Sequence, residues 1–138
     1  MVNRFDLQQL SEVRVQEAES LLNSSLTDGA YYLAGYAVEC ALKACVAKQT
    51  REFDFPDRAV VNDSYTHDLD KLVRVAGLEI ELREKSASNK QFEVNWNLVK
   101  DWSEGARYER HDERKVRDFF SAITDRRTGV LAWLRDHW

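Results

Sequence analysis

The stretch Ala30-Tyr-Tyr-Leu-Ala-Gly-Tyr-Ala-Val-Glu-Cys-Ala-Leu-Lys-Ala-Cys-Val46 is the longest apolar-rich run in the sequence. Its apolar residues recur at steps of three and four, which is the period of an α-helix. At 3.6 residues per turn they form one broad apolar face. The narrow opposite face carries Tyr32, Tyr36, Glu39 and Lys43. A helix this apolar is expected at the centre of a domain, with the rest of the chain packed around it.

The composition predicts one globular domain that spans residues 1–138. Of the 138 residues, 43% are hydrophobic and 32% are charged, as is usual for a soluble protein with a single core. The net charge of -4 argues against general polyanion binding, so nucleic acid would need a local basic patch. No apolar run is long enough to span a bilayer, and the first residues lack the apolar core of a signal peptide. We therefore expect a cytoplasmic protein.

The cysteines and glycines give no sign of a metal or cofactor site. Cys40 and Cys45 lie five apart on one predicted helix, where they point in different directions, so we expect two buried thiols and no disulfide. No Cys/His spacing resembles a zinc site, and none of the five glycines lies in a glycine-rich loop. We expect no metal and no cofactor.

The helix-forming composition, with a single proline, predicts an all-α fold. We expect an up-and-down antiparallel bundle of four main helices and one short helix. The main helices are predicted from about Arg4 to Asn23, capped by Asn3 with Asp6 in the first turn; from an N-cap at Thr27 or Asp28 to about Gln49; from about Lys90 to Gly105; and from about Asp112 to the end. The short helix is predicted from Thr66 or His67 to Ala76, with Gly77 as its stop.

Other segments carry weaker patterns. The segment from Thr50 to Tyr65 is predicted to be irregular but packed, because it contains Phe53, Phe55, Val60 and Val61. The segment from Leu78 to Ser88 fits either a helical turn or a mobile loop. In the last predicted helix, Arg127 falls on the apolar seam and Gly129 lies in the interior.

The candidate site is the junction Trp102-Ser-Glu-Gly-Ala-Arg-Tyr-Glu-Arg-His-Asp112. Its candidate binding residues are Glu104, Tyr108 and Arg110, together with Arg114 in the following helix, and its candidate catalytic pair is Arg107 and His111. The start of a helix favours an anion, and arginine can bind a phosphate bidentately. Histidine can carry a proton near neutral pH, so an Arg–His pair beside a phosphate suits metal-independent RNA cleavage.

Plainer interpretations stand beside these. The junction fits a solvated ion-pair network, because five basic and four acidic residues alternate between Glu104 and Arg117. His67 fits a residue that starts a helix, and Glu39 fits a surface ion pair with Lys43, four residues on. The tyrosines Tyr31, Tyr32 and Tyr36 fit a core or an interface, or a surface on which bases stack.

Three features in order resemble the HEPN family, the higher eukaryotes and prokaryotes nucleotide-binding domains. They are a long first helix followed by Tyr31-Tyr-Leu-Ala-Gly-Tyr-Ala-Val-Glu-Cys-Ala-Leu-Lys-Ala44, the helix start Thr66-His-Asp-Leu69, and Trp102-Ser-Glu-Gly-Ala-Arg-Tyr108 before a final amphipathic helix. The resemblance covers essentially the whole chain. It implies a helical bundle that is commonly a homodimer and associates with RNA or nucleotides. Many members are toxin ribonucleases, or pair with a small nucleotidyltransferase-like partner in toxin–antitoxin or defence modules.

The resemblance also implies where catalysis would lie. Ribonucleases of the family carry an arginine and a histidine separated by four to six residues near the start of the last helix, with the sites of two subunits facing each other. Here three residues separate Arg107 from His111, and two residues four apart share one face if the segment is helical. Glu104 and Glu109 would repel a phosphate.

Three hypotheses follow. The first is a non-catalytic HEPN-like domain that dimerises and binds a nucleotide, RNA or a nucleotidyltransferase-type partner, with Tyr32, Tyr36, Glu39 and Lys43 as the candidate dimer face. The alternative is a metal-independent toxin-type ribonuclease that uses Arg107 and His111 at a dimer cleft. The third is a scaffold whose tyrosine-bearing helix face serves only as a dimer seam. The shortened Arg–His separation and the acidic net charge favour the first.

Overall fold

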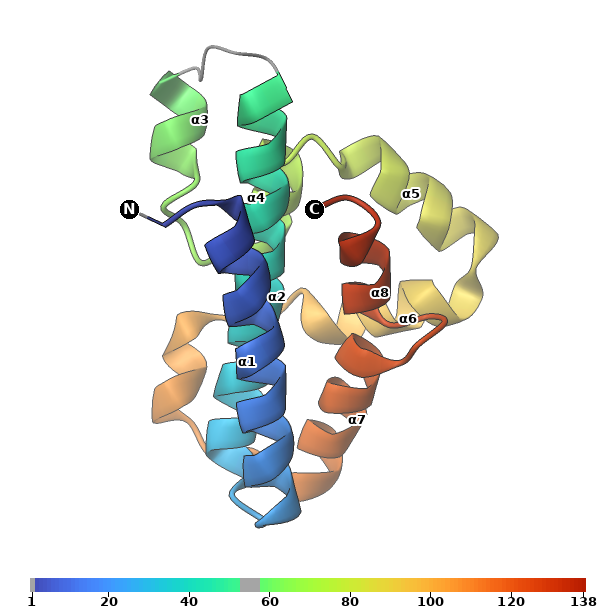
Figure 1. Cartoon of the computed structure of the whole chain (residues 1–138). Coiled ribbons are helices and arrows are strands. Elements are labelled where there is room, and N and C mark those ends of the chain that lie inside the picture. The colour runs from blue at the N-terminus through green and yellow to red at the C-terminus, as the bar shows by residue number, and fades with distance from the viewer. Residues whose placement is uncertain (1, 53–57) are drawn as a thin grey trace.

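The computed structural model describes residues 2–52 and 58–138, and in these ranges every regular element is a helix. Figure 1 shows their arrangement. The elements are α1 (Arg4–Asn23), α2 (Thr27–Glu52), α3 (Arg58–Asp63), α4 (Leu69–Val75), α5 (Glu79–Ser88), α6 (Lys90–Val99), the 3₁₀-helix η1 (Glu104–Tyr108), α7 (Glu113–Thr124) and α8 (Val130–Arg135). None of the described helices combines the length and the hydropathy needed to cross a membrane.

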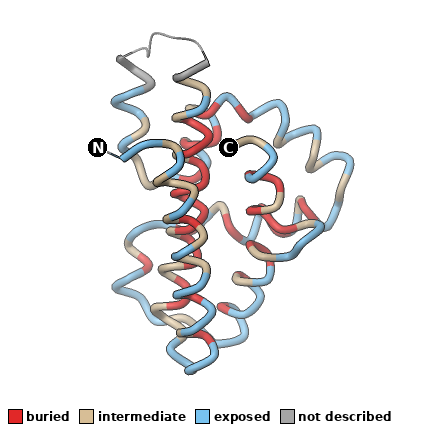
Figure 2. Tube along the Cα trace, viewed as in Figure 1, coloured by how far each residue is buried: buried red, intermediate tan, exposed pale blue. Residues whose placement is uncertain are grey.

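The central position predicted for the second helix is confirmed. Helix α2 contacts α1, α4, η1, α7 and α8, and the continuous buried stretch along it is visible in Figure 2. Val38 and Leu42 are completely buried. They belong to one hydrophobic cluster, to which α1, α2, α4, α6, η1, α7 and α8 all contribute. The apolar face of α2 therefore organises the domain, as its periodicity predicts.

The first helix begins and ends at the predicted residues. Asn3 accepts a hydrogen bond from the Asp6 backbone N–H (2.9 Å), and the Asp6 carboxylate accepts one from the Asn3 N–H (3.0 Å), which is a complete capping box. The predicted N-cap of α2 is wrong, because Thr27 and Asp28 lie inside the helix. The carboxylate of Asp28 instead accepts a hydrogen bond from the backbone of His111.

The predicted count of four main helices and one short helix is wrong, since the described chain has eight α-helices and η1. The helix predicted to run from Lys90 to Gly105 ends at Val99. There the chain turns so that Trp102 can pack against α2 at Gly35. A Cβ atom on Gly35 would lie 2.2 Å from Trp102 Nε1. This close approach, which no local pattern reveals, stops the helix early.

The last predicted helix is divided into α7 and α8 by a turn at residues 125–129. The Asp125 carboxylate accepts hydrogen bonds from the backbone N–H groups of Arg127 (2.9 Å) and Thr128 (2.8 Å), and these bonds lower the pKa of Asp125. Gly129 caps α8, and a Cβ there would meet the Asp125 carbonyl oxygen at 2.4 Å. Arg127 is therefore an exposed turn residue and not part of the apolar seam.

The segment predicted to be irregular is partly helical, since α2 continues to Glu52 and α3 begins at Arg58. Val61 is 40% exposed, against the packing predicted for it. The predicted packing of Phe53, Phe55 and Val60 lies outside the described residues and side chains.

The segment from Leu78 to Ser88 forms helix α5, with Glu79 and Glu81 in its first turn and Lys85 in its last, where such charges favour a helix. The short helix α4 starts after an Asp68 N-cap, later than predicted. Gly77, with φ +71°, ends it as predicted.

Candidate functional site

The candidate junction is built from η1 and the linker that leads into α7. Ala106 is buried and holds η1 against α2, while Tyr108 is 80% exposed. Asp112 caps α7 by accepting a hydrogen bond from the Lys115 N–H. Arg107 lies in η1 and His111 in the linker, so the two residues do not share a face of one helix as the spacing suggests.

Exposed cationic and aromatic groups gather on the outer side of this junction. The guanidinium carbon of Arg107 lies 4.8 Å from the centroid of the Tyr108 ring, within the range of a cation–π contact. Arg110 and Arg114 are also exposed. Within the described chain none of these three arginines makes an ion pair. The segment thus presents one exposed aromatic ring and three available guanidinium groups.

His111, in contrast, is packed inside the domain, with 2% of its side chain exposed. Its ring stacks on Tyr31 with centroids 3.9 Å apart, and Nε2 lies 3.3 Å from the carbonyl oxygen of Ala106. Its backbone N–H donates a 2.6 Å hydrogen bond to Asp28. Burial, followed by the charges of Glu109 and Asp101, raises the pKa of Tyr31. The imidazole therefore joins the linker to the start of α2.

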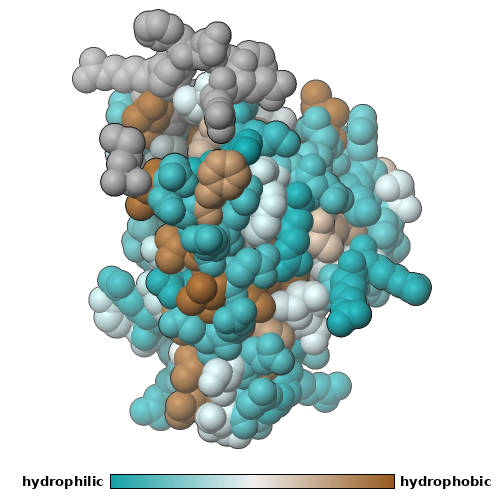
Figure 3. Space-filling view, viewed as in Figure 1, coloured by the Kyte–Doolittle hydropathy of each residue, from teal (hydrophilic) through white to brown (hydrophobic). Residues whose placement is uncertain are grey.

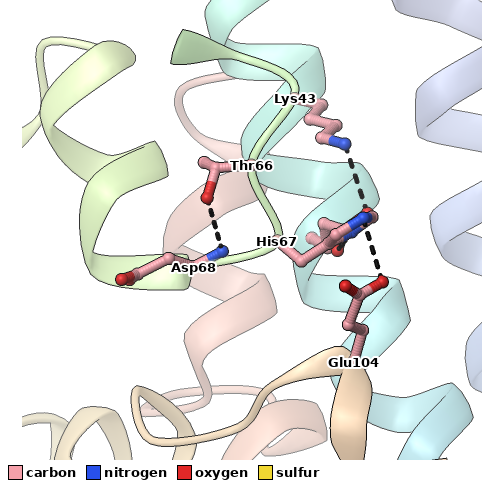
Figure 4. A network of polar contacts seen from close by, with 6 residues as sticks. Lys43, Thr66, His67, Asp68 and Glu104 are labelled. Carbon is pink, nitrogen blue, oxygen red and sulfur yellow. Dashed lines mark hydrogen bonds and ion pairs between the residues drawn. The ribbon is translucent and has the colours of Figure 1, made fainter.

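A second polar cluster joins α2, the loop before α4 and η1 (Figure 4). Glu39 is 1% exposed; its Oε1 lies 2.7 Å from His67 Nδ1 and its Oε2 lies 3.3 Å from Lys43 Nζ. On its far side, His67 Nε2 lies 3.1 Å from Glu104 Oε2. Figure 4 shows His67 between Lys43 and Glu104.

This cluster corrects two interpretations from the sequence. The Glu39–Lys43 pair is confirmed, but Glu39 is a buried carboxylate and not a surface residue. His67 lies outside α4, and its ring joins two acidic residues from other elements. One local feature of the sequence indicates this cluster: a glutamate stands between Val38 and Cys40 in the most apolar helix. A charge that is buried there needs partners.

A cavity of about 510 Å³ lies next to the cluster. It is lined by Thr66, His67, Asp68, Asp70, Lys100, Asp101, Trp102, Ser103 and Glu104. Acidic side chains outnumber basic ones in this lining, so an anion is better accommodated by the arginines on the outer side of η1. Across the described ranges, no three His, Cys, Asp or Glu residues are placed to hold a metal ion.

The candidate dimer face lies on α2 beside α1. Tyr32 and Tyr36 are half-buried with ring centroids 6.0 Å apart, and burial is the main cause that raises the pKa of Tyr36. A groove of about 660 Å³ runs alongside, lined by Val2 and by residues of α1, α2, α3 and the segment after α3. Glu39 reaches only its floor, so Tyr32, Tyr36 and Lys43 are the members of this face with exposed surface.

The surface around the groove is mixed in polarity. Figure 3 shows a mainly hydrophilic face with scattered hydrophobic side chains, and α1 exposes Phe5 and Val13. Below the surface, Cys40 and Cys45 are buried free thiols as predicted. Burial raises the pKa of Cys40 to about 11 and that of Cys45 to about 12, so neither is a reactive nucleophile.

The fold and the junction define an all-helical domain with an apolar central helix and an arginine- and tyrosine-bearing segment before the last helices. The family model of the HEPN domain matches residues 7–136, which is nearly the whole chain. The chain therefore belongs to the HEPN family, as its sequence resemblance predicts. No curated protein and no solved structure matches it.

Proposed function

We propose that this HEPN domain binds RNA through η1 and the following linker without cleaving it. The observation that supports this most directly is the unequal exposure of the Arg–His pair. Arg107 is exposed beside Tyr108, whereas the His111 imidazole is buried against Tyr31. A proton carrier must reach the proton that it transfers, so a buried imidazole favours binding over catalysis.

The exposed groups suit single-stranded RNA. The ring of Tyr108 offers a face on which a base can stack, a contact worth about 1–3 kcal/mol. Arg107, Arg110 and Arg114 lie in or after the same segment and can bind successive phosphates. Because the net charge of the chain is -4, binding should be confined to this segment and should weaken steeply with salt.

The test compares two tyrosines of nearly equal exposure, Tyr108 (80%) and Tyr65 (78%). Fluorescence anisotropy with a labelled single-stranded RNA should show binding about 5- to 150-fold weaker for Tyr108→Ala, the loss of one stacked base. Tyr65→Ala should bind like wild type. Equal affinities for wild type and Tyr108→Ala would contradict the proposed binding surface.

The same RNA, incubated with the protein in EDTA, separates binding from cleavage. We expect the RNA to remain intact. Cleavage that is lost in His111→Ala and in Arg107→Ala would instead support the second hypothesis, a metal-independent ribonuclease. That outcome would require the imidazole of His111 to leave its packing against Tyr31.

We further propose that the domain forms a homodimer through the α1–α2 groove and the face made by Tyr32, Tyr36 and Lys43. HEPN domains commonly dimerise, and these half-exposed tyrosines lie beside a largely apolar groove. Sedimentation should show a particle of about 32 kDa, twice the 16.1 kDa chain. Tyr36→Glu should shift it toward the monomer, and Tyr108→Ala should not.

A monomer at micromolar concentration would contradict the dimer. In that case the same face would be available to a nucleotidyltransferase-type partner, the alternative occupant that the sequence resemblance suggests.

A further inference from the structure

Three segments that are distant in sequence meet around His67. Helix α2 contributes Glu39 and Lys43, the loop before α4 contributes His67, and η1 contributes Glu104. Glu39 is the only one of the four that is fully buried, at 1% exposure. Its two carboxylate oxygens face different partners, Lys43 Nζ and the imidazole ring of His67, and a buried carboxylate requires such partners.

The geometry of the imidazole makes His67 a spacer of fixed length. Its two nitrogens point in opposite directions, one toward Glu39 (2.7 Å) and the other toward Glu104 (3.1 Å). When both nitrogens carry a proton, each can donate to a carboxylate. A glutamine in this place has one NH₂ group at the end of a flexible chain and cannot span the two carboxylates in the same way.

Besides this ring, η1 is held by the packing of Ala106 on α2 and by the contact of His111 Nε2 with the Ala106 carbonyl oxygen. A 3₁₀-helix has poorer hydrogen-bond geometry than an α-helix, and only Ala106 of η1 is buried. Over the ranges that the structure describes, the His67–Glu104 contact is the one ion pair that joins η1 to another element. Arg107 and Tyr108 lie three and four residues after Glu104 in the same short helix, so their position depends on where Glu104 is held.

We infer that His67 is a positioning residue for the RNA-binding segment: it links buried Glu39 to Glu104 and so fixes η1, with Arg107 and Tyr108, on α2. This inference rests on the proposed RNA-binding function. It assigns His67 no contact with RNA. Loss of the link leaves the core of α2 in place, frees η1 to open locally, and weakens RNA binding because a mobile platform must be ordered on binding.

The experiment measures amide hydrogen exchange and RNA affinity on the full chain. In His67→Gln, the amides of residues 104–108 should exchange about fivefold faster or more, the size of effect expected for one coupled contact. RNA affinity should fall several-fold in parallel. The matched control is Lys71→Ala, which removes the Lys71–Asp63 ion pair near the same loop without reaching η1, and it should change neither quantity.

Substitutions at Glu104 test the link from its other end. Glu104→Ala should match His67→Gln, and the double variant should exchange no faster than either single variant, because both remove the same contact. Glu104→Gln keeps an oxygen that can accept from Nε2 and should restore most of the protection of η1. If His67→Gln fails to fold, as judged by circular dichroism, Glu104→Ala tests the same link from an exposed residue.

The outcomes separate the inference from the proposed function. If residues 104–108 exchange as in wild type in His67→Gln, the inference is overturned, even if Tyr108→Ala weakens RNA binding. Where His67→Gln does not fold, unchanged exchange in Glu104→Ala overturns it in the same way. Additive effects in the double variant would overturn it as well. If Tyr108→Ala binds RNA like wild type, the RNA-binding proposal fails, whereas faster η1 exchange in His67→Gln would still support the link.

Discussion

Gly35 determines where the chain can turn toward the candidate site. Trp102 is 2% exposed and occupies the space that a side chain at position 35 would need. Its indole N–H has no hydrogen-bond partner among the described residues, which costs about 1–3 kcal/mol. Burial of about 150–250 Å² of a large aromatic residue offsets that cost. One glycine thus fixes Trp102, which lies two residues before the first residue of η1.

Gly35→Ala should therefore destabilise the domain. A methyl group 2.2 Å from Trp102 Nε1 forces repacking that costs about 1–3 kcal/mol, against a gain of about 1 kcal/mol in helix propensity. Urea denaturation should show a lower free energy of unfolding. The control is Gly105→Ala, where the nearest atom, Ser103 Oγ, lies 3.5 Å away. If Gly35→Ala and Gly105→Ala are equally stable, the packing argument is wrong.

Glu39 shows why residue environments are only partly predictable from sequence. Helical periodicity correctly pairs it with Lys43, because that pair lies four residues apart on one helix. Its contact with His67 spans 28 residues along the chain, and His67 in turn contacts Glu104 of η1. Such partners follow from how helices pack together, so a projection of α2 alone placed Glu39 on the surface.

At the scale of elements, prediction succeeds where the signals are local. The start of α1 follows from its capping box, and the stop after α4 follows from Gly77, which takes a positive φ. The early end of α6 depends on Trp102 packing on α2 and has no local signal. The turn between α7 and α8 has a local signal, because Asp125, Thr128 and Gly129 are turn-forming residues. However, the apolar residues on both sides of the turn keep a helical period, and this period predicts one continuous helix.

The contact between the start of α2 and the linker gives a prediction at this scale. Asp28 accepts a 2.6 Å hydrogen bond from the His111 N–H, a charge-assisted bond between two elements. Because Asp28 is half-buried, Asp28→Ala should lower the free energy of unfolding by about 1–2 kcal/mol. Asp28→Asn keeps an acceptor oxygen and should lose less. Chemical denaturation of both variants would show the difference, and equal stability of Asp28→Ala and wild type would rule out this anchor.

At the scale of the whole molecule, the buried thiols make the free energy of unfolding fall as the pH becomes alkaline. The pKa of Cys40 is about 11 and that of Cys45 about 12, whereas an unfolded cysteine titrates near about 8.5. The folded state therefore keeps protons that the unfolded chain releases. The contribution is complete below about pH 8.5 and is lost as pH rises toward 11–12, at up to about 1.4 kcal/mol per pH unit for each thiol.

Urea unfolding between pH 8 and about 10.5 would measure this loss. The free energy of unfolding should fall with pH in the wild type, and less steeply in the double variant Cys40→Ala/Cys45→Ala. Slopes are compared instead of absolute stabilities, because removing buried sulfur atoms also lowers the starting value. Parallel slopes would show that the thiols are not responsible.

Helix α8 completes the core from the end of the described chain. Leu131 and Leu134 are fully buried, Arg135 pairs with Glu12 of α1 at 2.9 Å, and Gln8 of α1 donates to the Trp138 carbonyl oxygen at 3.0 Å. On the ribosome, at about 5–20 residues per second, on the order of 10 s separates the end of α2 from α8. During that time the nascent chain displays the apolar surface of α2 that α8 will cover. The order of synthesis thus leaves this part of the apolar face of α2 uncovered until α8 has been made.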